Sequence, residues 1–198
     1  MPDPTAAGRP FVTRRIEDRR LVRLVRRHHP SATGVGWGAS RFVPDPGDLP
    51  PDRRFRALYA APDLTTAFAE TVLRDAAVGL PDRYPLSLEE LDLWDVATLH
   101  ADGLVAVDLT GPHLVAARVA TDAVRAMDQT EGQRLGLEVH SDSRAFDALL
   151  YPSRLTGSEN LMVFERAIPG RVTAASRGPL LEEPAFAAVL DDLRVIIA

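Results

Sequence analysis

The residue types best suited to chemistry lie in a few separated segments of this chain. One of them, Tyr151-Pro-Ser-Arg-Leu-Thr-Gly-Ser-Glu-Asn160, is a short polar loop with apolar runs on both sides. Strands around such a loop would present the Ser153 hydroxyl and the Asn160 amide to a ligand. We expect Ser153 to hold a phosphate or a ribose hydroxyl, and Asn160 to brace the loop or contact the ligand. No G-x-S-x-G elbow and no suitably placed His accompanies Ser153, so a catalytic triad is not predicted.

A helix predicted from Pro62-Asp63 to about Ala77 carries the most informative acid, Glu70. Proline in the first turn and an acid near the positive end of the helix dipole favour a helix start. Glu70 lies at the edge of an apolar stripe formed by Leu64, Ala67, Phe68, Thr71 and Val72. A carboxylate held there against a cavity stabilises positive charge that develops on a sugar ring during glycosidic cleavage. The alternative interpretation is an ordinary solvated helix Glu.

Three upstream residues suit a flat, anionic ligand. Arg41 lies in the Gly-rich stretch 30–51, a long loop of the kind that is more often functional than idle. Arg23 lies in an apolar segment, 21–25, that fits either a helix or a first strand, and only a strand would turn it inward. A buried Arg needs an anionic partner, because an uncompensated charge is costly to bury. Tyr59 ends a predicted strand, 55–61, where its ring either stacks on a heterocycle or packs in the core.

The remaining elements mix strands and helices in irregular order, which predicts an α+β fold rather than a doubly wound sheet. Strands are expected over 93–99 and 104–109, joined by a turn at 101–103, and over 148–151 and 160–167. Helices are expected over 121–127, 132–140 and 185–195, with a short helical turn at 86–91 and a linker at 179–184.

Composition excludes several classes of protein. The 198 residues suit one domain, and 45% hydrophobic content with 26% charged residues is typical of soluble globular proteins. The net charge of −5 argues against a direct nucleic-acid binder, although all 23 basic residues are Arg, which grips phosphate well. No apolar run long enough to span a membrane and no leader is visible, so we expect a cytoplasmic protein.

Metal chemistry is not predicted. The chain has no cysteine, and its five histidines lack the spacing of a zinc site, since His28 and His29 are adjacent and the others stand alone. The Gly34-Val-Gly-Trp-Gly38 stretch lacks the Lys-Ser/Thr of a phosphate-binding loop.

Order and spacing of these segments resemble the RES domain family, over about three quarters of the chain. The resemblance rests on Arg23, Ser40-Arg41-Phe42, Leu58-Tyr59 with Ala67-Phe-Ala-Glu70, and Tyr151-Pro-Ser153 followed by Asn160-Leu161 and Phe164. The commoner form of the second motif is Gly-Arg-Trp, and this chain has Phe42 in the position of the Trp. The resemblance implies an ADP-ribosyltransferase-like fold, with a mixed sheet that is split around an NAD cleft and has flanking helices. The NAD-binding catalytic domain is then expected over 16–178. A flexible N-terminal extension over 1–15 and a C-terminal helix packed on the domain over 179–198 complete the chain.

The resemblance also implies a toxin that degrades NAD, by phosphorolysis to nicotinamide and ADP-ribose 1″-phosphate or by hydrolysis, and that is blocked by an antitoxin of the Xre/MbcA/ParS type. NAD is then the substrate, inorganic phosphate the co-substrate, and no cofactor or metal is needed. Arg23 and Arg41 would hold the pyrophosphate and, with Ser153, the attacking phosphate. Tyr59 would pack on nicotinamide, and Glu70 would stabilise the charge at the anomeric carbon.

Two other functions stay open at this point. The first is an ADP-ribosyltransferase that modifies a macromolecule, and the second is a non-catalytic module that binds a nucleotide or an antitoxin. A homo-oligomer is also open, with the apolar face of the last helix as the interface.

Overall fold

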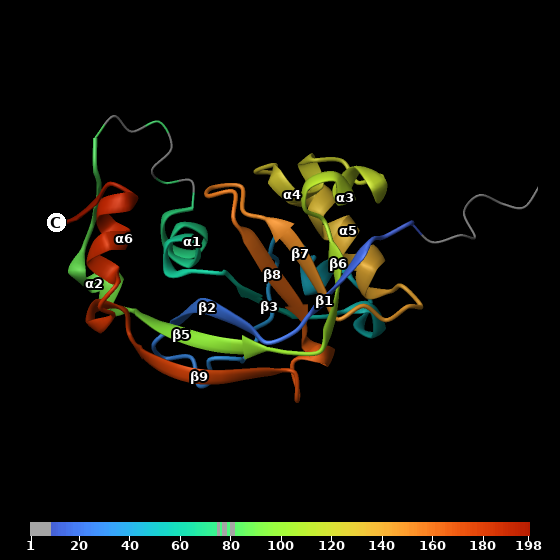
Figure 1. Cartoon of the computed structure of the whole chain (residues 1–198), viewed down its shortest axis with the longest axis horizontal. Coiled ribbons are helices and arrows are strands. Elements are labelled where there is room, and N and C mark those ends of the chain that lie inside the picture. The colour runs from blue at the N-terminus through green and yellow to red at the C-terminus, as the bar shows by residue number, and fades with distance from the viewer. Residues whose placement is uncertain (1–8, 75, 77–78, 80–81) are drawn as a thin grey trace, which may run out of the picture.

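The computed structural model describes residues 9–74, 76, 79 and 82–198, and the strands in these ranges form three sheets (Figure 1). The largest sheet has five strands in the order β1-β6-β7-β8-β3. A second sheet has the order β2-β5-β9, and a third pairs β10 with β4 in parallel. The strands are β1 (Thr13–Ile16), β2 (Arg19–Arg26), β3 (Ala57–Ala60), β4 (Tyr84–Leu86), β5 (Trp94–Ala101), β6 (Leu104–Asp108), β7 (Ala148–Pro152), β8 (Glu159–Phe164), β9 (Val172–Pro179) and β10 (Val195–Ile197).

Helices cover the sheets in two groups (Figure 1). The group α3, α4 and α5 lies at one end of the molecule over the five-stranded sheet, and α2 and α6 lie at the other end. The α-helices are α1 (Leu64–Phe68), α2 (Leu88–Asp92), α3 (Gly111–Ala116), α4 (Asp122–Arg125), α5 (Thr130–His140) and α6 (Phe186–Asp192). A π-helical segment, η3 (Ala69–Leu73), continues α1, and single 3-10 turns are η1 (Pro46–Asp48), η2 (Pro51–Arg53), η4 (Glu165–Ala167) and η5 (Leu180–Glu182).

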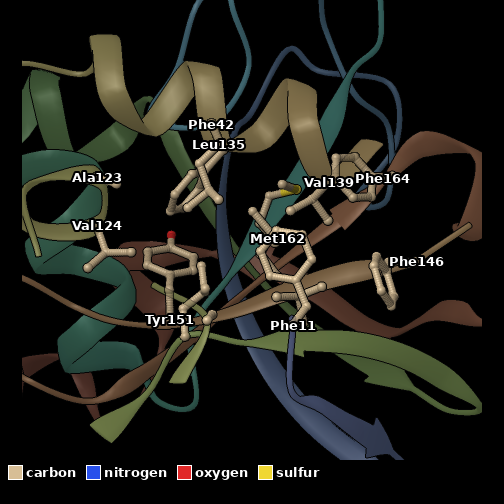
Figure 2. Close-up of a cluster of buried hydrophobic side chains, with 14 of the residues drawn as sticks. Phe11, Phe42, Ala123, Val124, Leu135, Val139, Phe146, Tyr151, Met162 and Phe164 are labelled. Carbon is tan, nitrogen blue, oxygen red and sulfur yellow. The ribbon is translucent and has the colours of Figure 1, made fainter. Parts of the chain in front are cut away.

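The five-stranded sheet is buried on both faces. Along β7, Leu149 and Tyr151 face a core shared with α4 and α5, whereas Ala148 and Leu150 face a core shared with the three-stranded sheet. This alternation follows from the two-residue period of a strand, and it explains why β7 reads as a continuous apolar run. Figure 2 shows the first of these cores, in which Tyr151 packs beside Phe42 with ring centroids 4.8 Å apart.

Besides their shared core, the two larger sheets are joined by a backbone bridge. Val22 of β2 and Ala61, one residue beyond β3, exchange two backbone hydrogen bonds of 2.8 Å. This bridge brings β2 beside the end of β3, from which the chain enters α1. A third core, which includes Phe68 of α1 and Phe186 of α6, covers this junction.

The mixed α+β class with split sheets and flanking helices is confirmed, and the ambiguous segment 21–25 is part of strand β2. The flexible extension was predicted over 1–15, but the structure orders the last part of this range. Phe11 is buried, and Thr13–Ile16 forms β1, which pairs with β6, because a strand partner on the sheet edge orders this segment. Residues 1–8, and the predicted end of the Glu70 helix at residue 77, lie outside the described residues.

Three further predictions change with the structure. The turn at 101–103 does join two strands, but β5 and β6 belong to different sheets, so they form no hairpin. Strand β9 and helix α3 were not predicted from the sequence. The predicted linker 179–184 contains η5 with the fully buried Leu180, and the last helix ends at Asp192 because Val195–Ile197 pairs with β4.

On α6, Phe186 and Val189 are buried in the third core, whereas Ala187 and Ala188 are exposed. A homo-oligomer stays a prediction. Within the described ranges, none of the helices has the length and apolar character that crossing a membrane requires.

Candidate active site

A cavity of about 500 Å³ opens where β2, the end of β3, the 39–41 loop and η3 come together. Its volume falls in the range of small-molecule and cofactor sites. The lining consists of Arg23, Leu24, Ala39, Ser40, Arg41, Tyr59, Glu70, Thr71, Arg74, Met127, Gln129, Tyr151 and Arg154. We call this the main cavity.

A smaller recess of about 40 Å³ adjoins the main cavity. Six residues line both spaces: Arg23, Leu24, Tyr59, Glu70, Thr71 and Tyr151. The residues that line the recess alone, among them Ala67 and Asn160, are buried. Because buried residues line it, we call the recess the inner end of the site, and Glu70 lines both the recess and the main cavity.

Glu70 is placed by a change of helix type. Asp63 caps α1 by accepting a hydrogen bond of 2.7 Å from the Thr66 amide, and the following residues, Ala69–Leu73, continue as a π-helix. A π-helical turn widens the helix and rotates its side chains, and such turns recur at functional sites. The predicted position of Glu70 at the edge of an apolar helix face is what the structure shows, with Ala69 and Leu73 buried on either side.

Two residues of the segment 151–160 hold the Glu70 carboxylate in place by hydrogen bonds. The Ser153 hydroxyl donates a hydrogen bond of 2.6 Å to Glu70 Oε1, and Asn160 Nδ2 donates one of 3.3 Å to the same oxygen. Ser153 Oγ also accepts hydrogen bonds from the amides of Leu155 and Thr156, at 3.2 and 3.1 Å. The loop thus forms a rigid support for the acid.

This arrangement bears on the roles expected for Ser153 and Asn160. Ser153 is 2% exposed and is absent from the described lining of either space, while Asn160 lines only the recess. Both residues donate a hydrogen bond to Glu70, which brings the predicted site residues together. Ser153 contacts the carboxylate and does not line either space in the described residues. A direct contact between Ser153 and a phosphate stays a prediction.

Arg23 brings a buried positive charge to the cavity wall. Its Nη1 donates to the backbone carbonyls of Ala32 and Gly34, at 2.8 and 2.9 Å. Burial lowers the pKa of Arg23 to about 10. Among the described residues no carboxylate forms an ion pair with it. Since strand β2 directs it inward, Arg23 is prepared to receive an anion.

Arg41 is held by the helices on the other wall. Its Nη1 donates a hydrogen bond of 2.9 Å to the Ala126 carbonyl, at the C-terminal end of α4. The backbone of Arg41 and Phe42 lies directly on α5, because Gly132 and Gly136 carry no side chain there. A Cβ at either glycine would collide with a backbone oxygen of this loop.

Tyr59 links the loop to the sheet. Its hydroxyl is 2.8 Å from Ser40 Oγ and accepts a hydrogen bond of 3.1 Å from the Phe42 amide. Burial raises the pKa of Tyr59 to about 12, so the phenol is neutral near pH 7. Its ring lines both the main cavity and the recess, where a flat ligand could pack on it.

The structure adds lining residues that the sequence did not single out, chiefly Tyr151, Arg74, Arg154, Met127 and Gln129. Tyr151 belongs to the same motif as Ser153, and Arg74 follows Glu70 by one helical turn, so spacing carried a signal for these two. Met127 and Gln129 lie on the connection between α4 and α5, and no pattern in the sequence singles them out.

The charges of the main cavity are strongly asymmetric. Of its described lining residues, Arg23, Arg41, Arg74 and Arg154 carry guanidinium groups, and Glu70 is the one carboxylate. Such a site binds a polyanion through its arginines and stabilises a cation at its inner end. In the described residues, no group of three or more His, Cys, Asp or Glu is placed to hold a metal ion.

Comparisons with known proteins identify a family and a similar fold. The model of a family described as "RES domain" matches residues 15–184. A protein of Sinorhizobium fredii (strain NBRC 101917 / NGR234), named "Probable toxin y4kH", is 31% identical over 127 residues, which are 63% of this chain and 99% of that protein. The crystal structure of the M. tuberculosis MbcT–MbcA toxin–antitoxin complex contains a chain with a similar fold. Its TM-score is 0.67 at 20% identity, over 92% of this chain and 91% of that one.

Proposed function

Since this chain belongs to the RES domain family, we propose that it is the toxin of a toxin–antitoxin pair and acts by degrading NAD. It cleaves the bond between nicotinamide and ribose by phosphorolysis, which yields nicotinamide and ADP-ribose 1″-phosphate. The observation that carries this proposal is the position of Glu70, fixed by Ser153 and Asn160 at the inner end of a cavity that arginines surround.

The substrate is placed by matching its charges to those of the cavity. The nicotinamide riboside lies at the inner end beside Glu70, with its pyridinium ring against Tyr59. The pyrophosphate lies at Arg23 and Arg41, whose fork-shaped guanidinium groups suit phosphate oxygens. Arg23 gains most from this pairing, because its buried charge meets only carbonyl oxygens in the free protein.

The reaction then needs little proton transfer. As the C1″–N bond breaks, its electron pair moves to the ring nitrogen and neutralises the pyridinium, so nicotinamide leaves without protonation. Positive charge develops at C1″ and the ring oxygen, and the Glu70 carboxylate stabilises it. A phosphate oxygen forms the new bond to C1″, and the phosphate group releases its proton to solvent.

Glu70→Gln tests the chemistry, because the amide keeps the size of the side chain and removes its charge. We expect the rate of nicotinamide release from NAD to fall about 100-fold, on the order of 3 kcal/mol of barrier. Glu89→Gln is the matched control, since Glu89 is an exposed helix acid on α2, away from the cavity. Unchanged turnover in Glu70→Gln would contradict the proposed role.

Proton and phosphorus NMR of the reaction, run with and without inorganic phosphate, identifies the acceptor. ADP-ribose 1″-phosphate as the product supports phosphorolysis, whereas free ADP-ribose at the same rate in both samples shows that water is the acceptor. Label transferred from NAD to protein or nucleic acid would instead show an ADP-ribosyltransferase.

The partner follows from the same proposal. We expect an antitoxin of the Xre/MbcA/ParS type, and the structural neighbour was itself solved in a complex of a toxin with an antitoxin. The product of the adjacent gene, added to the purified chain, should suppress nicotinamide release in proportion to complex formation. Full activity in a stable complex would refute inhibition by that protein.

A further inference from the structure

Two exposed side chains line the main cavity at its outer end. Met127 and Gln129 belong to the connection between α4 and α5, and neither lines the recess beside Glu70. Met127 is 70% exposed, an unusual position for a large apolar side chain. Within the described part of the chain, the side-chain amide of Gln129 makes no hydrogen bond.

The position of these residues follows from Arg41. Its guanidinium group donates to the carbonyl of Ala126, the residue directly before Met127. Arg74 and Arg154 also line the main cavity without lining the recess, and they add further guanidinium groups for a pyrophosphate. Met127 and Gln129 thus lie on the cavity wall that holds Arg41, within the same cavity that Glu70 lines.

Hydrogen bonds hold the connection in its conformation, although its residues are exposed. Asp128 accepts hydrogen bonds from the amide and the hydroxyl of Thr130, at 2.9 and 2.7 Å, which fixes the turn at the start of α5. One turn further along α5, Gln133 Nε2 donates to the Ser40 carbonyl at 3.2 Å. The connection and the Arg41 loop thus form one wall, and a ligand would meet it with little ordering cost.

We propose that Met127 and Gln129 form the subsite for the adenine ring of the dinucleotide, an inference that rests on the proposed function. The Met127 thioether packs on the face of the ring, since sulfur makes favourable contacts with aromatic groups. The Gln129 amide faces the edge of the base, donating to N7 and accepting from the N6 amino group, the pairing by which glutamine selects adenine. Hypoxanthine presents an oxygen in place of that amino group, so it loses one bond and meets the Gln129 oxygen unfavourably.

The test compares substrates that differ only at this end. Nicotinamide release is measured from NAD, from nicotinamide hypoxanthine dinucleotide and from nicotinamide mononucleotide, which lacks the base. We expect the unmodified protein to prefer NAD about 10-fold over the hypoxanthine analogue, as one paired base edge would give. Gln129→Ala removes this preference and raises the KM for NAD about 10-fold with kcat unchanged, while turnover of the mononucleotide stays as it was.

Met127→Ala raises the KM for both dinucleotides together, because packing on the ring does not depend on the amino group. Val115→Ala on α3 is the matched control, an equally exposed apolar residue, 75% exposed, that does not line the cavity. A Gln129→Ala variant that keeps the full preference for NAD, or that loses turnover of the mononucleotide equally, would overturn the subsite.

Binding separates this inference from the proposed function. Calorimetry with ADP and with inosine diphosphate measures base recognition without any reaction. Tighter binding of ADP in the unmodified protein, lost in Gln129→Ala, supports the subsite even if no variant degrades NAD. Equal binding of the two diphosphates refutes the subsite, even if NAD is degraded as proposed.

Discussion

Replacement of Ser153 by alanine distinguishes a residue that positions the acid from one that binds the phosphate. The hydroxyl donates at 2.6 Å to Glu70 Oε1 and accepts from the amides of Leu155 and Thr156, at 3.2 and 3.1 Å. It is therefore the centre of the loop that supports the carboxylate. With the hydroxyl removed, the hydrogen bond that remains to Glu70 among those of the described residues is the longer one from Asn160, at 3.3 Å.

The magnitude follows from the kind of bond that is lost. A hydrogen bond to a charged group contributes about 1.5–3 kcal/mol. If about 2 kcal/mol of that support is lost where charge develops, kcat falls roughly 30-fold. Activity is not abolished, because the carboxylate and the bond from Asn160 remain. The loop also loses two acceptor contacts, so we expect the free energy of unfolding to decrease by about 1–2 kcal/mol.

The assay is steady-state nicotinamide release, with phosphate and NAD varied separately. A positioning role predicts a lower kcat with the KM for phosphate unchanged. Ser158→Ala in the same loop is the matched control, since Ser158 does not contact Glu70. If Ser153→Ala instead keeps kcat and raises only the KM for phosphate, the hydroxyl binds phosphate directly and the reasoning from the Glu70 contact is wrong.

Three other predictions concern the walls of the site and the stability of the fold. Gly136→Ala places a Cβ 2.8 Å from the Phe42 carbonyl carbon, so we expect the free energy of unfolding, measured in urea, to decrease by about 2 kcal/mol. Arg134→Ala, on the exposed face of α5, is the control and should change this free energy little. Equal decreases in the two variants would contradict the close packing of α5 on the loop. Burial lowers the pKa of His140 from 6.5 to about 4, so the folded state excludes a proton that the unfolded chain binds. This contribution to the free energy of unfolding is complete above pH 6.5, and it decreases by about 1–2 kcal/mol as the pH falls to 4. In His140→Gln, the free energy of unfolding measured by denaturation at each pH should depend less steeply on pH. Pyrophosphate should raise the Tm of the unmodified protein but not of Arg23→Gln, and equal shifts would show that the anion binds elsewhere.

Side-chain type and local spacing allowed much of the site to be predicted. Arg23, Arg41, Tyr59 and Glu70 were chosen as charged or aromatic residues in defined local contexts, and all of them line the main cavity. Met127 and Gln129 were not found, because a Met and a Gln in a helix connection resemble any exposed turn. Only the bond from Arg41 to the connection shows that it forms a wall of the cavity.

The sequence predicted the strands better than it predicted which strands pair with one another. Segments 93–99 and 104–109 read as strands around a Gly turn, but such a turn does not determine whether they pair with each other. Here β5 pairs with β2 and β9, whereas β6 pairs with β1 and β7, and the chain passes from one sheet to the other at the turn.

Alternating and helical patterns in the sequence established an α+β chain, an acid at the edge of a buried helix face, and arginines in segments that could reach a common ligand. These features are local, since they depend on neighbours a few residues away. Tertiary structure alone decided which groups meet. The bridge between Val22 and Ala61 sets Arg23 beside Tyr59, and the contact with Ser153 turns a polar loop into the support of Glu70. Contacts across 83 and 90 residues of chain, from Ser153 and Asn160 to Glu70, arise only when the sheets have formed, because no local pattern encodes which distant segment packs there.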